Sequence, residues 1–514
     1  MLQKLLSKLN AKSVEHRTST MVFLRLLAAV YFIAFLSLWT QVPGLIGRRG
    51  ILPAYYYLKV AHEQLGTEAY YLLPTLGWFN SSDTFWQFLC AGGALMALVP
   101  LAGVLSAPLF LLMWMFYLSL VTVARDFLAF QWDGLLLETG FLAVFLAYPR
   151  LFPKRSDTAA PAAPVLLLLW WLLFRLIFSS GMVKLLSGDP TWRSFTALNF
   201  HYETQPLPNA VSWFMHQLPA GFQKVSVAGM FVLELGLPFF IFAPRRLRWV
   251  ACAGLVWLQL FLLVTGNYAF FNLLTIALCV LLLDEGAWRK LRLVRAFSPA
   301  PCQAGTLEGC EPSPGSNWPV WIILPLAVAM LLVTSNVFTE GLGWQIPWPS
   351  PVARLTSWAA PFCIANRYGL FAVMTTERPE IVLEGSQDGE HWESYEFKYK
   401  PGQLTHRPPF VAPHQPRLDW QMWFAALGPY QQNVWFTSLC NRLLQGSPEV
   451  LALLDRNPFP EAAPKFVRGV FYDYHFTDSA ARRATRQWWR RELKGQYSPV
   501  MTLPERAEAK VEEK

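Results

Sequence analysis

Residues 165–183 read VLLLLWWLLFRLIFSSGMV, a run in which one arginine interrupts otherwise apolar or small residues. A helix needs roughly 17–25 such residues to cross the hydrocarbon core of a bilayer. The stretch therefore predicts a membrane-spanning helix. Because charge inside a membrane is costly, we expect Arg175 to have a partner or a role within the protein.

The same pattern recurs along the first two thirds of the chain. Val22–Thr40 has no A-x-A cleavage site after it, so we expect a retained anchor rather than a signal peptide. Leu135–Tyr148 and Tyr268–Leu283 are short for a span, and we expect them to be longer in reality, tilted or re-entrant. The remaining candidates, which bring the count to about nine, are Phe85–Val104, Ala107–Ala124, Val225–Phe242, Trp249–Thr265 and Val320–Phe338.

The composition of the 514 residues points the same way. Apolar residues make up 54% and charged residues 15%, against about 25% charged in soluble domains. These values exclude a disordered chain, a coiled coil and an ordinary soluble enzyme. The net charge of +9 does not indicate nucleic-acid binding, because most of the basic excess lies in loops beside the apolar runs.

The distribution of basic residues predicts the topology. If the N-terminus is cytoplasmic, the inner segments 1–21, 105–106, 149–164, 243–248 and 284–319 hold 14 Lys and Arg. The outer segments 41–84, 125–134, 184–224 and 266–267 hold 7. Basic residues favour the cytoplasmic side, and an odd number of spans then puts residues 340–514 in the lumen or periplasm.

We expect an α-helical multi-pass membrane domain followed by a β-rich C-terminal extramembrane domain. The membrane helices occupy 22–283, with large outer loops at 41–84 and 184–224. The other expected parts are a basic cytoplasmic lead at 1–21, a flexible linker at 284–319, a last span at 320–338, the β-rich outer domain at 350–480 and a basic helix with a tail at 481–514.

Local patterns in the C-terminal third predict both strands and a helix. Ile381–Glu384 and Tyr395–Tyr399 read as strands, and Asp388-Gly389 between them predicts a hairpin, because Gly accepts positive φ. Ala480–Gln496 reads as a basic helix with five arginines around two tryptophans. This helix could lie on anionic head groups or dock on its own domain.

The seven cysteines do not fix the redox compartment. Cys90, Cys252 and Cys279 fall inside apolar runs and suit small core positions. Two pairs share a loop or a domain and could form disulfides, namely Cys302 with Cys310 and Cys363 with Cys440. The sequence contains no cluster of zinc-ligand spacing, so we expect no metal.

Ionisable residues within or at the end of apolar runs are candidates for function. Arg25 lies in the first turn of its run and can reach water. Arg175 could pair with Glu138 or Glu234, and such a pair could either fix helix register or serve a function. Lys184, at the outer end of the same helix, could extend to water or, if partly buried, act as a base through a lowered pKa.

The outer segment that follows is dense in polar and aromatic side chains. These could recognise a partner, perform acid–base chemistry, or simply form a self-capped loop on the membrane surface. The candidates are Trp192, His201, Tyr202, Glu203, Gln205 and His216. The sequence has no Ser-His-Asp order, HExxH, phosphate loop or dinucleotide fingerprint, and we expect no cofactor.

Three stretches carry a resemblance to a known family. FRLIFSSGMVKLLSGDPTWRSFTALNFHYETQPLPNAVSWFMHQLP (Phe174–Pro219), QWDGLLLETGFLAVFLAYP (Gln131–Pro149) and PRLDWQMWFAALG (Pro416–Gly428) resemble the lipase maturation factor family. The resemblance covers most of residues 20–495. It implies a multi-pass membrane protein, in vertebrates of the endoplasmic reticulum, that helps secreted dimeric lipases reach their active state.

A weaker resemblance bears on mechanism. Gly181-Met182-Val183-Lys184-Leu185, followed by Asp189 and Trp192, is similar to a stretch of vitamin K-dependent γ-glutamyl carboxylases. In those enzymes the position that matches Lys184 is their basic lysine. The spacing departs from the carboxylase pattern through the inserted Ser-Gly-Asp-Pro residues, which puts the transfer of that role in doubt.

We therefore expect a membrane-embedded factor that assists folding, assembly or maturation of secreted proteins such as lipases, and not an enzyme. The alternative is an intramembrane enzyme that uses Lys184 as a base. The expected partners are a secreted client and the lipid bilayer, in a bacterial plasma membrane or an endoplasmic reticulum membrane. We expect client contacts at exposed aromatic residues, with core packing as the alternative for each; these are Trp420, Trp423 and Trp435.

Overall fold

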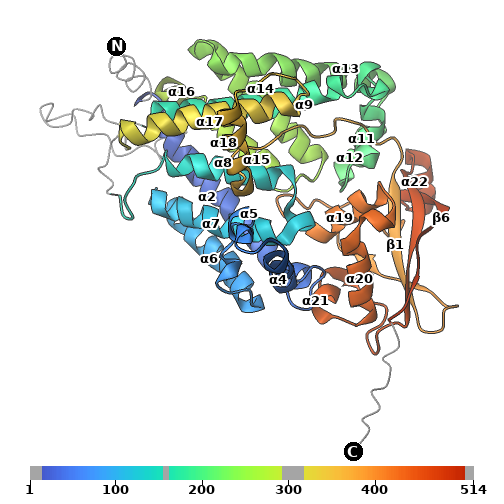
Figure 1. The fold of residues 1–514 in the computed structure, drawn as a ribbon. Helices are drawn as coiled ribbons and strands as arrows, with labels where there is room; N and C mark the ends of the chain where they lie inside the picture. Colours follow the sequence, from blue (N-terminus) through green and yellow to red (C-terminus); the bar gives the residue numbers. More distant parts are fainter. Residues whose placement is uncertain (1–13, 154–160, 292–317, 504–514) are drawn as a thin grey trace, which may run out of the picture.

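The computed structural model describes residues 14–153, 161–291 and 318–503. Long helices form a bundle, and a smaller part with a four-stranded sheet packs against one end of it (Figure 1). The bundle corresponds to the expected membrane domain, and the part after residue 350, called the tail here, contains the expected strands. The predicted fold class is confirmed.

Seven helices among the described residues are long and apolar enough to cross a membrane, and the chain is a multi-pass integral membrane protein. Each overlaps a run that the sequence predicted as a span. They are α2 (Arg17–Trp39), α6 (Asp83–Leu101), α7 (Ala107–Ala124), α9 (Ala163–Leu186), α13 (Ala220–Phe231) continued by η3 (Val232–Gly236) and η4 (Leu237–Phe242), α14 (Arg245–Thr265) and α17 (Val320–Gly341).

The two candidates that looked short are short helices. α8 (Gln131–Val144) and α15 (Phe271–Val280) would measure about 21 and about 15 Å at the α-helical rise, less than the roughly 30 Å of a hydrocarbon core. Most of their side chains are buried in the protein. Since they are surrounded by other helices, they need not match the thickness of the lipid. The count of nine crossings stays a prediction.

The segments expected on the inner side lie together in space. The Thr18 backbone N–H donates to Glu285 Oε1 at 2.9 Å, and Arg245 Nε lies 2.7 Å from Asp284 Oδ2. The N-terminal end of α2, the tight loop before α14 and α16 (Glu285–Leu291) therefore meet at one end of the bundle. Most of the lead and most of the 284–319 linker, including Cys302 and Cys310, lie outside the described residues.

The four segments expected on the outer side all contact the tail at the opposite end. The three longer ones contain short helices rather than open loops, namely α3 (Val42–Ile46), α4 (Ala54–Leu65), α5 (Glu68–Leu72), η1 (Leu76–Trp78), η2 (Arg125–Leu128), α10 (Pro190–Arg193), α11 (Leu198–Thr204) and α12 (Ala210–His216). The contacts include α3 with α21 (Pro448–Leu451), Phe127 with Arg417, Thr204 with Trp423 and Asn267 with Val411.

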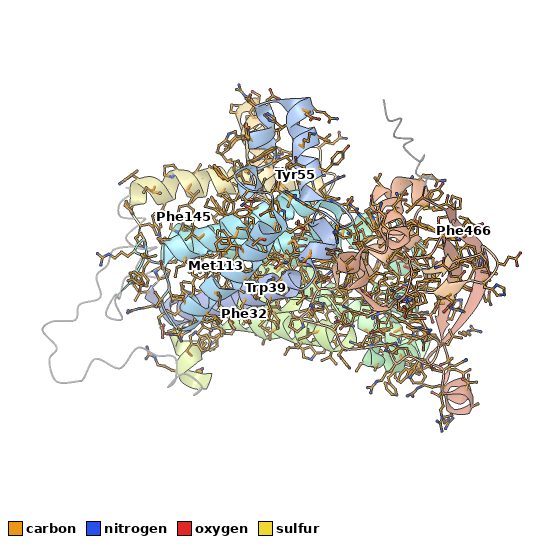
Figure 2. The ribbon with its side chains drawn as sticks, turned by 90° about the horizontal axis from the view of Figure 1, so that it is seen from below. Phe32, Trp39, Tyr55, Met113, Phe145 and Phe466 are labelled. Atoms are coloured by element: carbon orange, nitrogen blue, oxygen red, sulfur yellow. The ribbon has the colours of Figure 1, made fainter. Side chains whose placement is uncertain are left out.

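A second view separates these regions. In Figure 2, Phe145 lies toward one end of the molecule and Phe466, in the tail, lies at the other. Tyr55 marks α4, which projects from the bundle in this view, and the ring of Tyr55 is half exposed. Met113 on α7 is fully buried, in the hydrophobic core that continues from the helices into the tail.

The tail combines a sheet with helices. Four antiparallel strands have the order β2-β1-β5-β6, and their bounds are β1 (Pro379–Ser386), β2 (Glu393–Ser394), β5 (Phe466–Phe476) and β6 (Trp489–Met501). A two-stranded sheet pairs β3 (Glu396–Phe397) with β4 (Leu454–Arg456). The helices are α18 (Ser350–Ala359), η6 (Ala360–Phe362), α19 (Arg417–Ala426), η7 (Tyr430–Gln432), α20 (Val434–Leu444), α21 and α22 (Ser479–Thr485).

The predicted turn at Asp388-Gly389 is confirmed, but the strand that returns beside β1 is Glu393–Ser394 and not the predicted Tyr395–Tyr399, within which β3 pairs with β4 instead. β1 and β2 pair with Gly385 opposite Glu393, and Gly389 in the turn has a φ of 84°. Asp388 Oδ1 accepts hydrogen bonds from the backbone N–H groups of Glu390 and His391, at 2.8 Å each. The side chain of Asp388 thus replaces the backbone partners that the turn lacks.

The predicted basic helix over 480–496 is correct only as far as Thr485 and wrong beyond it. Asp478 caps a helix that ends at Thr485, and Arg486 takes a left-handed conformation with a φ of 60°. The chain then runs as β6 along the edge of the sheet, paired with β5. The basic residues of this edge strand are exposed, and charge on a free edge opposes pairing with other chains.

The pairing of Cys363 with Cys440, which the sequence left open, is not formed. Both cysteines are free, and Cys440 lies fully buried in the core formed by α20 and its neighbours. Cys440 is a small apolar core residue, as the three cysteines in the apolar runs are.

One buried ion pair joins the tail to the membrane domain. Arg417, at the start of α19, binds Asp133 of α8 through two hydrogen bonds of 2.6 and 2.8 Å. Tyr117 donates to the same carboxylate at 2.5 Å. Both charged side chains are at most 1% exposed, so each neutralises the charge of a partner that water cannot reach.

Arg417→Leu should lower the free energy of unfolding by about 3–5 kcal/mol, because it leaves Asp133 buried without its partner. Arg417→Leu combined with Asp133→Leu should recover most of that loss. Thermal unfolding of the purified chain in detergent measures both. Arg468→Leu is the control, because its partner Glu384 is at a partly exposed site, and it should cost less than about 1 kcal/mol. Losses that simply add in the double variant would show that the two residues are not coupled.

Candidate functional site

A cavity of about 650 Å³ lies in the membrane domain between α9, α11, α13, α14 and α15. Most of its walls are apolar, and Leu370 and Phe371 of the segment before β1 close one side. Five of the residues singled out in the sequence line it, namely Lys184, Trp192, His201, Tyr202 and Glu234. Part of the outer segment and the intramembrane charge Glu234 thus belong to one site.

Lys184 and Glu234 form a buried ion pair beside this cavity. Lys184 Nζ lies 2.8 and 3.1 Å from the two carboxylate oxygens, and it donates to the Ser180 carbonyl at 2.9 Å. Lys184 is 5% exposed and Glu234 is 7% exposed. The expectation that Lys184 extends to water is therefore wrong, because the protein itself surrounds the ammonium group.

The local backbone explains why these two residues meet. Glu234 lies in η3, one turn of π-helix within the Ala220–Phe242 segment, a distortion that is frequent at functional sites. Gly181 on α9 faces this turn, and a Cβ there would lie 2.6 Å from the Leu235 side chain and 3.1 Å from Glu234 Cβ. Only glycine lets the two helices approach closely enough for the ion pair.

The ion pair bears on the alternative of a catalytic base. A base must present its amine to a substrate, whereas Lys184 Nζ already makes three hydrogen bonds within the protein, to the Ser180 carbonyl and to both oxygens of Glu234. Both oxygens of Glu234 accept from the same amine. The arrangement therefore favours a structural pair over a general base.

His201 belongs to a chain of hydrogen bonds whose direction can be assigned. Gln205 Nε2 donates to the carbonyl of Thr265 at 3.0 Å, so its Oε1 is the acceptor for the Tyr268 hydroxyl at 2.9 Å. Tyr268 must then accept from His201 Nε2–H at 3.0 Å. Burial lowers the pKa of His201 to about 4, so the ring is neutral and Nδ1 has a free lone pair.

Glu203 points away from the cavity and contacts the tail. Its Oε2 accepts from the Phe476 backbone N–H at 2.5 Å, and its Oε1 lies 3.1 Å from His475 Nδ1. His216 Nε2 lies 3.7 Å from the same carboxylate. Burial lowers the pKa of His216 despite this carboxylate. These two predicted site residues join the outer segment to β5.

Arg378, which the sequence reasoning missed, holds the same segment. Its guanidinium is fully buried and donates to the carbonyls of Glu203, Gln205 and Pro206 at 2.7, 2.5 and 3.0 Å. A fourth bond of 2.8 Å goes to Glu380, whose carboxylate also binds Lys400. One side chain of the tail thus binds three carbonyls at and just after the C-terminal end of α11, where helical partners are lacking.

The predicted partner of Arg175 is Glu138, and their ion pair is present and buried. The tail completes this pair. The Asn366 backbone N–H and the Tyr368 hydroxyl donate to Glu138 Oε2 at 2.9 and 2.7 Å. Arg175 does not bind Glu234, because Glu234 pairs with Lys184 instead. The two intramembrane ion pairs lie on different sides of α9, as their nine-residue separation predicts.

The three tryptophans predicted as exposed client contacts are buried, at 3%, 6% and 3% exposure for Trp420, Trp423 and Trp435. Trp423 Nε1 donates to the Thr204 carbonyl at 2.9 Å, and Trp420 packs edge-on against Trp132 of α8. The expectation of exposure is wrong. These side chains fill the interface between tail and membrane domain, which the alternative of core packing describes.

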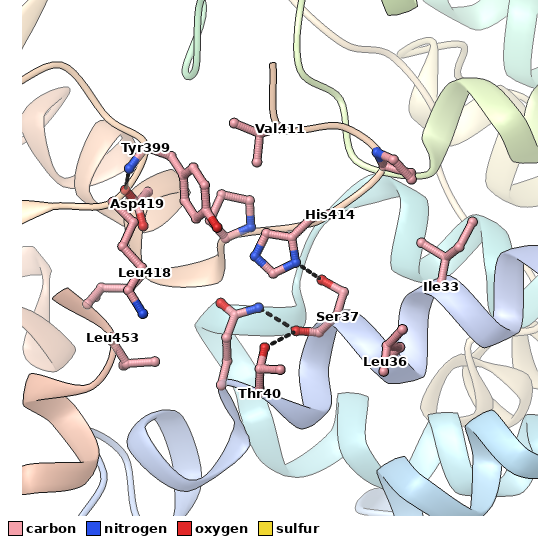
Figure 3. A pocket seen from close by; sticks show the side chains of 14 residues that line it. Ile33, Leu36, Ser37, Thr40, Tyr399, Val411, His414, Leu418, Asp419 and Leu453 are labelled. Carbon is pink, nitrogen blue, oxygen red and sulfur yellow. Dashed lines mark hydrogen bonds between the residues drawn. The ribbon is translucent and has the colours of Figure 1, made fainter. Parts of the chain in front are cut away.

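A second cavity, of about 540 Å³, lies where α2 meets the tail. In Figure 3, Ser37 and Thr40 of α2 line one side, and His414 lies above them, with its Nδ1 2.9 Å from Ser37 Oγ. Asp419 and Tyr399 line the other side. Burial lowers the pKa of His414 to about 4, so this imidazole is neutral at physiological pH.

Comparison with known proteins covers both the membrane domain and the tail. Residues 18–290 match the lipase maturation factor transmembrane domain, and residues 364–499 match the lipase maturation factor C-terminal domain. The chain belongs to the lipase maturation factor family. Lipase maturation factor 2 of Gallus gallus is 38% identical over 94% of this chain and 81% of its own length. No solved structure matches the chain.

Two further relatives extend the comparison. Lipase maturation factor 2 of Homo sapiens is 38% identical over 95% of this chain and 83% of the relative. Lipase maturation factor 1 of Mus musculus is 34% identical over 94% of this chain and 87% of the relative. Both family domains are therefore present in one chain, joined by the interface described above.

The family motif of the tail, PRLDWQMWFAALG, consists largely of residues at the interface between the tail and the membrane domain. It contains Arg417 and Asp419 among aromatic residues. This charged pair in an aromatic helix was a sign in the sequence that the helix is buried on both sides. Arg378 and Tyr268 carry no such signal. Within the described residues, no group of three or more His, Cys, Asp or Glu could hold a metal ion.

Asp419→Asn tests the electrostatics of the second cavity. Asp419 Oδ1 accepts from the Tyr399 and Lys400 N–H groups at 2.8 and 2.9 Å, and burial raises the pKa of Asp419 from 3.8 to about 6. The folded state thus holds a proton that the unfolded state releases. The free energy of unfolding should fall by up to about 3 kcal/mol as pH rises from 4 to 6.

Asparagine keeps the accepting oxygen and has no charge to bury. Asp419→Asn should therefore flatten this pH dependence and be at least as stable as the natural chain at pH 7.5. Melting temperatures measured in detergent between pH 4.5 and 7.5 compare the two. Asp455→Asn, at an exposed position of β4, should leave the profile unchanged. Equal slopes in the Asp419→Asn variant and the natural chain would contradict the prediction.

Proposed function

We propose that this chain is a membrane-embedded maturation factor that helps secreted lipases reach their folded, active state. The observation that carries the proposal is the match of both family domains, with relatives named lipase maturation factor 1 and 2 aligned along more than nine tenths of the chain. The buried Lys184–Glu234 pair gives no support to the alternative of an intramembrane enzyme.

The proposal includes a topology. The N-terminus and the loop at Arg246 face the cytoplasm, and the tail faces the compartment in which secreted proteins fold, the lumen of the endoplasmic reticulum or the periplasm. The 14-to-7 excess of basic residues supports this orientation. The contacts of the tail with all four outer segments support their common location on one side.

Because the three tryptophans are buried, the proposed client contacts lie on an exposed surface nearby. Phe424 and Leu427 at the end of α19, and Val434 at the start of α20, are 44%, 45% and 69% exposed. They lie within eleven residues of chain on a tail that packs against the membrane domain. Exposed apolar side chains suit transient contact with unfolded segments of a client.

A rescue experiment tests this function. The chain is expressed with a secreted lipase in cells that lack their own maturation factor, and lipase activity per secreted lipase protein is measured. The natural chain should restore activity. Phe424→Ser with Leu427→Ser should lower the rescue about tenfold, equivalent to roughly 1.4 kcal/mol of lost contact energy.

The control is Phe410→Ser, which removes a ring of similar exposure elsewhere on the tail. It should leave the rescue unchanged at equal protein level. A natural chain that is inserted at normal level but restores no lipase activity would refute the maturation role. Equal rescue by the natural chain and the Phe424, Leu427 variant would refute the contact surface alone.

Cysteine labelling tests the topology. Arg246→Cys and Glu390→Cys each place one thiol at an exposed position, in a background where Cys302, Cys310 and Cys363 are serine. In cells with a selectively permeabilised plasma membrane, an impermeant maleimide should label position 246 and not position 390. The reverse pattern would invert the proposed orientation.

A further inference from the structure

The cavity beside Lys184 contains buried polar atoms without a protein partner. His201 Nδ1, the Tyr202 hydroxyl and Asn272 Oδ1 have no hydrogen-bond partner among the described residues. All three residues line the cavity and are at least nine-tenths buried, at 8%, 1% and 0% exposure. Leaving such groups unpaired is unfavourable, so a molecule in the cavity that bonds to them would stabilise the site.

The chemistry of these atoms can be stated. His201 Nδ1 is an acceptor, because its other nitrogen donates to Tyr268. Asn272 Oδ1 is an acceptor, because Asn272 Nδ2 donates to Gln259 Oε1 at 2.9 Å. Tyr202 offers a hydroxyl that can donate. The site therefore fits a ligand with a hydroxyl group that donates and a carbonyl group that accepts.

The charge of the cavity is balanced internally. The only charged residues among its lining are Lys184 and Glu234, and each neutralises the other. An anionic or cationic head group would have to be buried without a counter-ion, which is costly. The occupant is therefore neutral.

The cavity opens toward the lipid side of the bundle. Its lining includes Val225, Val232 and Trp257, which are 72%, 67% and 58% exposed on the surface of the α13–η4 segment and α14. The segment Ala220–Phe242 is the least buried of the seven long helices, so it faces the bilayer. Gly229 lies on the same wall, and a Cβ there would meet nothing within 4 Å.

The geometry points to a binding site for a neutral acylglycerol, a membrane lipid with a free hydroxyl and ester carbonyls. A hydroxyl donates to one of the two acceptors, His201 Nδ1 or Asn272 Oδ1, an ester carbonyl accepts from Tyr202, and the acyl chains leave the cavity between α13 and α14. A volume of about 650 Å³ lies within the range of small-molecule sites. A sterol supplies the hydroxyl but no carbonyl for Tyr202.

Photolabelling of the full chain in nanodiscs tests the site. The probe is diacylglycerol with a diazirine in one acyl chain, and mass spectrometry locates the label. The label should map to α13 and α14. Gly229→Leu places a side chain in the opening and should lower labelling about tenfold, an equilibrium change of roughly 1.4 kcal/mol. Gly221→Leu, on the same helix at a position that does not line the cavity, should not change it.

A second variant tests the polar contacts. His201→Phe keeps a ring against Phe371 and removes the acceptor, so unlabelled diacylglycerol should compete about threefold to tenfold less well, the loss expected from one hydrogen bond. Its melting temperature identifies a folding defect, and the Gly229→Leu result stands independently of it.

Two further probes distinguish the sources of the ligand. Photoactivatable phosphatidylcholine should label these helices no more than it labels the rest of the lipid-facing surface. Equal cavity labelling by phosphatidylcholine, or diacylglycerol labelling that Gly229→Leu leaves unchanged, would overturn the proposal. Cavity labelling by a photoactivatable sterol alone would overturn the assignment to acylglycerols. None of these readouts depends on a lipase client, so the maturation role can fail without affecting the result.

Discussion

Three carboxylates buried within the described part of the bundle, Asp133, Glu138 and Glu234, each have a cation within hydrogen-bond distance, and the rest of the architecture depends on this pairing. Asp133 and Glu138 project from α8, a helix shorter than the hydrocarbon core of a bilayer. One partner, Arg175, comes from a neighbouring helix, and the other, Arg417, comes from the tail. The membrane domain is therefore incomplete by itself, since the tail supplies one of the two counter-charges and part of the hydrogen bonding of the other.

This dependence explains how the outer segments are ordered. The segment 184–224 has few strand or long-helix hydrogen bonds of its own, so its carbonyls need other donors. Arg378 supplies four hydrogen bonds to this segment and to Glu380, and Trp423 supplies one more. The same ordering places His201 and Tyr202 over the intramembrane cavity. The tail thus shapes a site to which it contributes few side chains itself.

The sequence predicted the parts that depend on local composition. Spans follow from runs of apolar residues, and the Asp388-Gly389 turn follows from the conformational freedom of glycine. A pair between Arg175 and a carboxylate was predictable because few charges occur in apolar runs, but Arg175 had two possible partners, and only the π-turn opposite Gly181, which brings Glu234 to Lys184, decides between them. The assignment of the residues beyond Thr485 to a helix failed because tertiary packing of Trp488 and Trp489 in the tail outweighs local helix propensity.

The candidate site was predictable as a set of residues but not as an arrangement. Lys184, His201 and Tyr202 were visible as unusual polar groups, whereas their convergence on one cavity depends on how five helices pack. The tryptophans of the tail motif were visible too, but hydrophobicity alone does not distinguish a surface for another protein from a surface for another part of the same chain. Trp420 and Trp423 belong to the second kind.

The ion pair between Asp133 and Arg417 also has a consequence for the synthesis of the chain. The two residues are separated by 284 positions in the chain. At a synthesis rate of about 5–20 residues per second, α8 leaves the ribosome roughly 15–60 s before Arg417 is made. During this interval the membrane holds a carboxylate that no arginine yet neutralises. A chain that stops before the tail keeps this charge without its arginine.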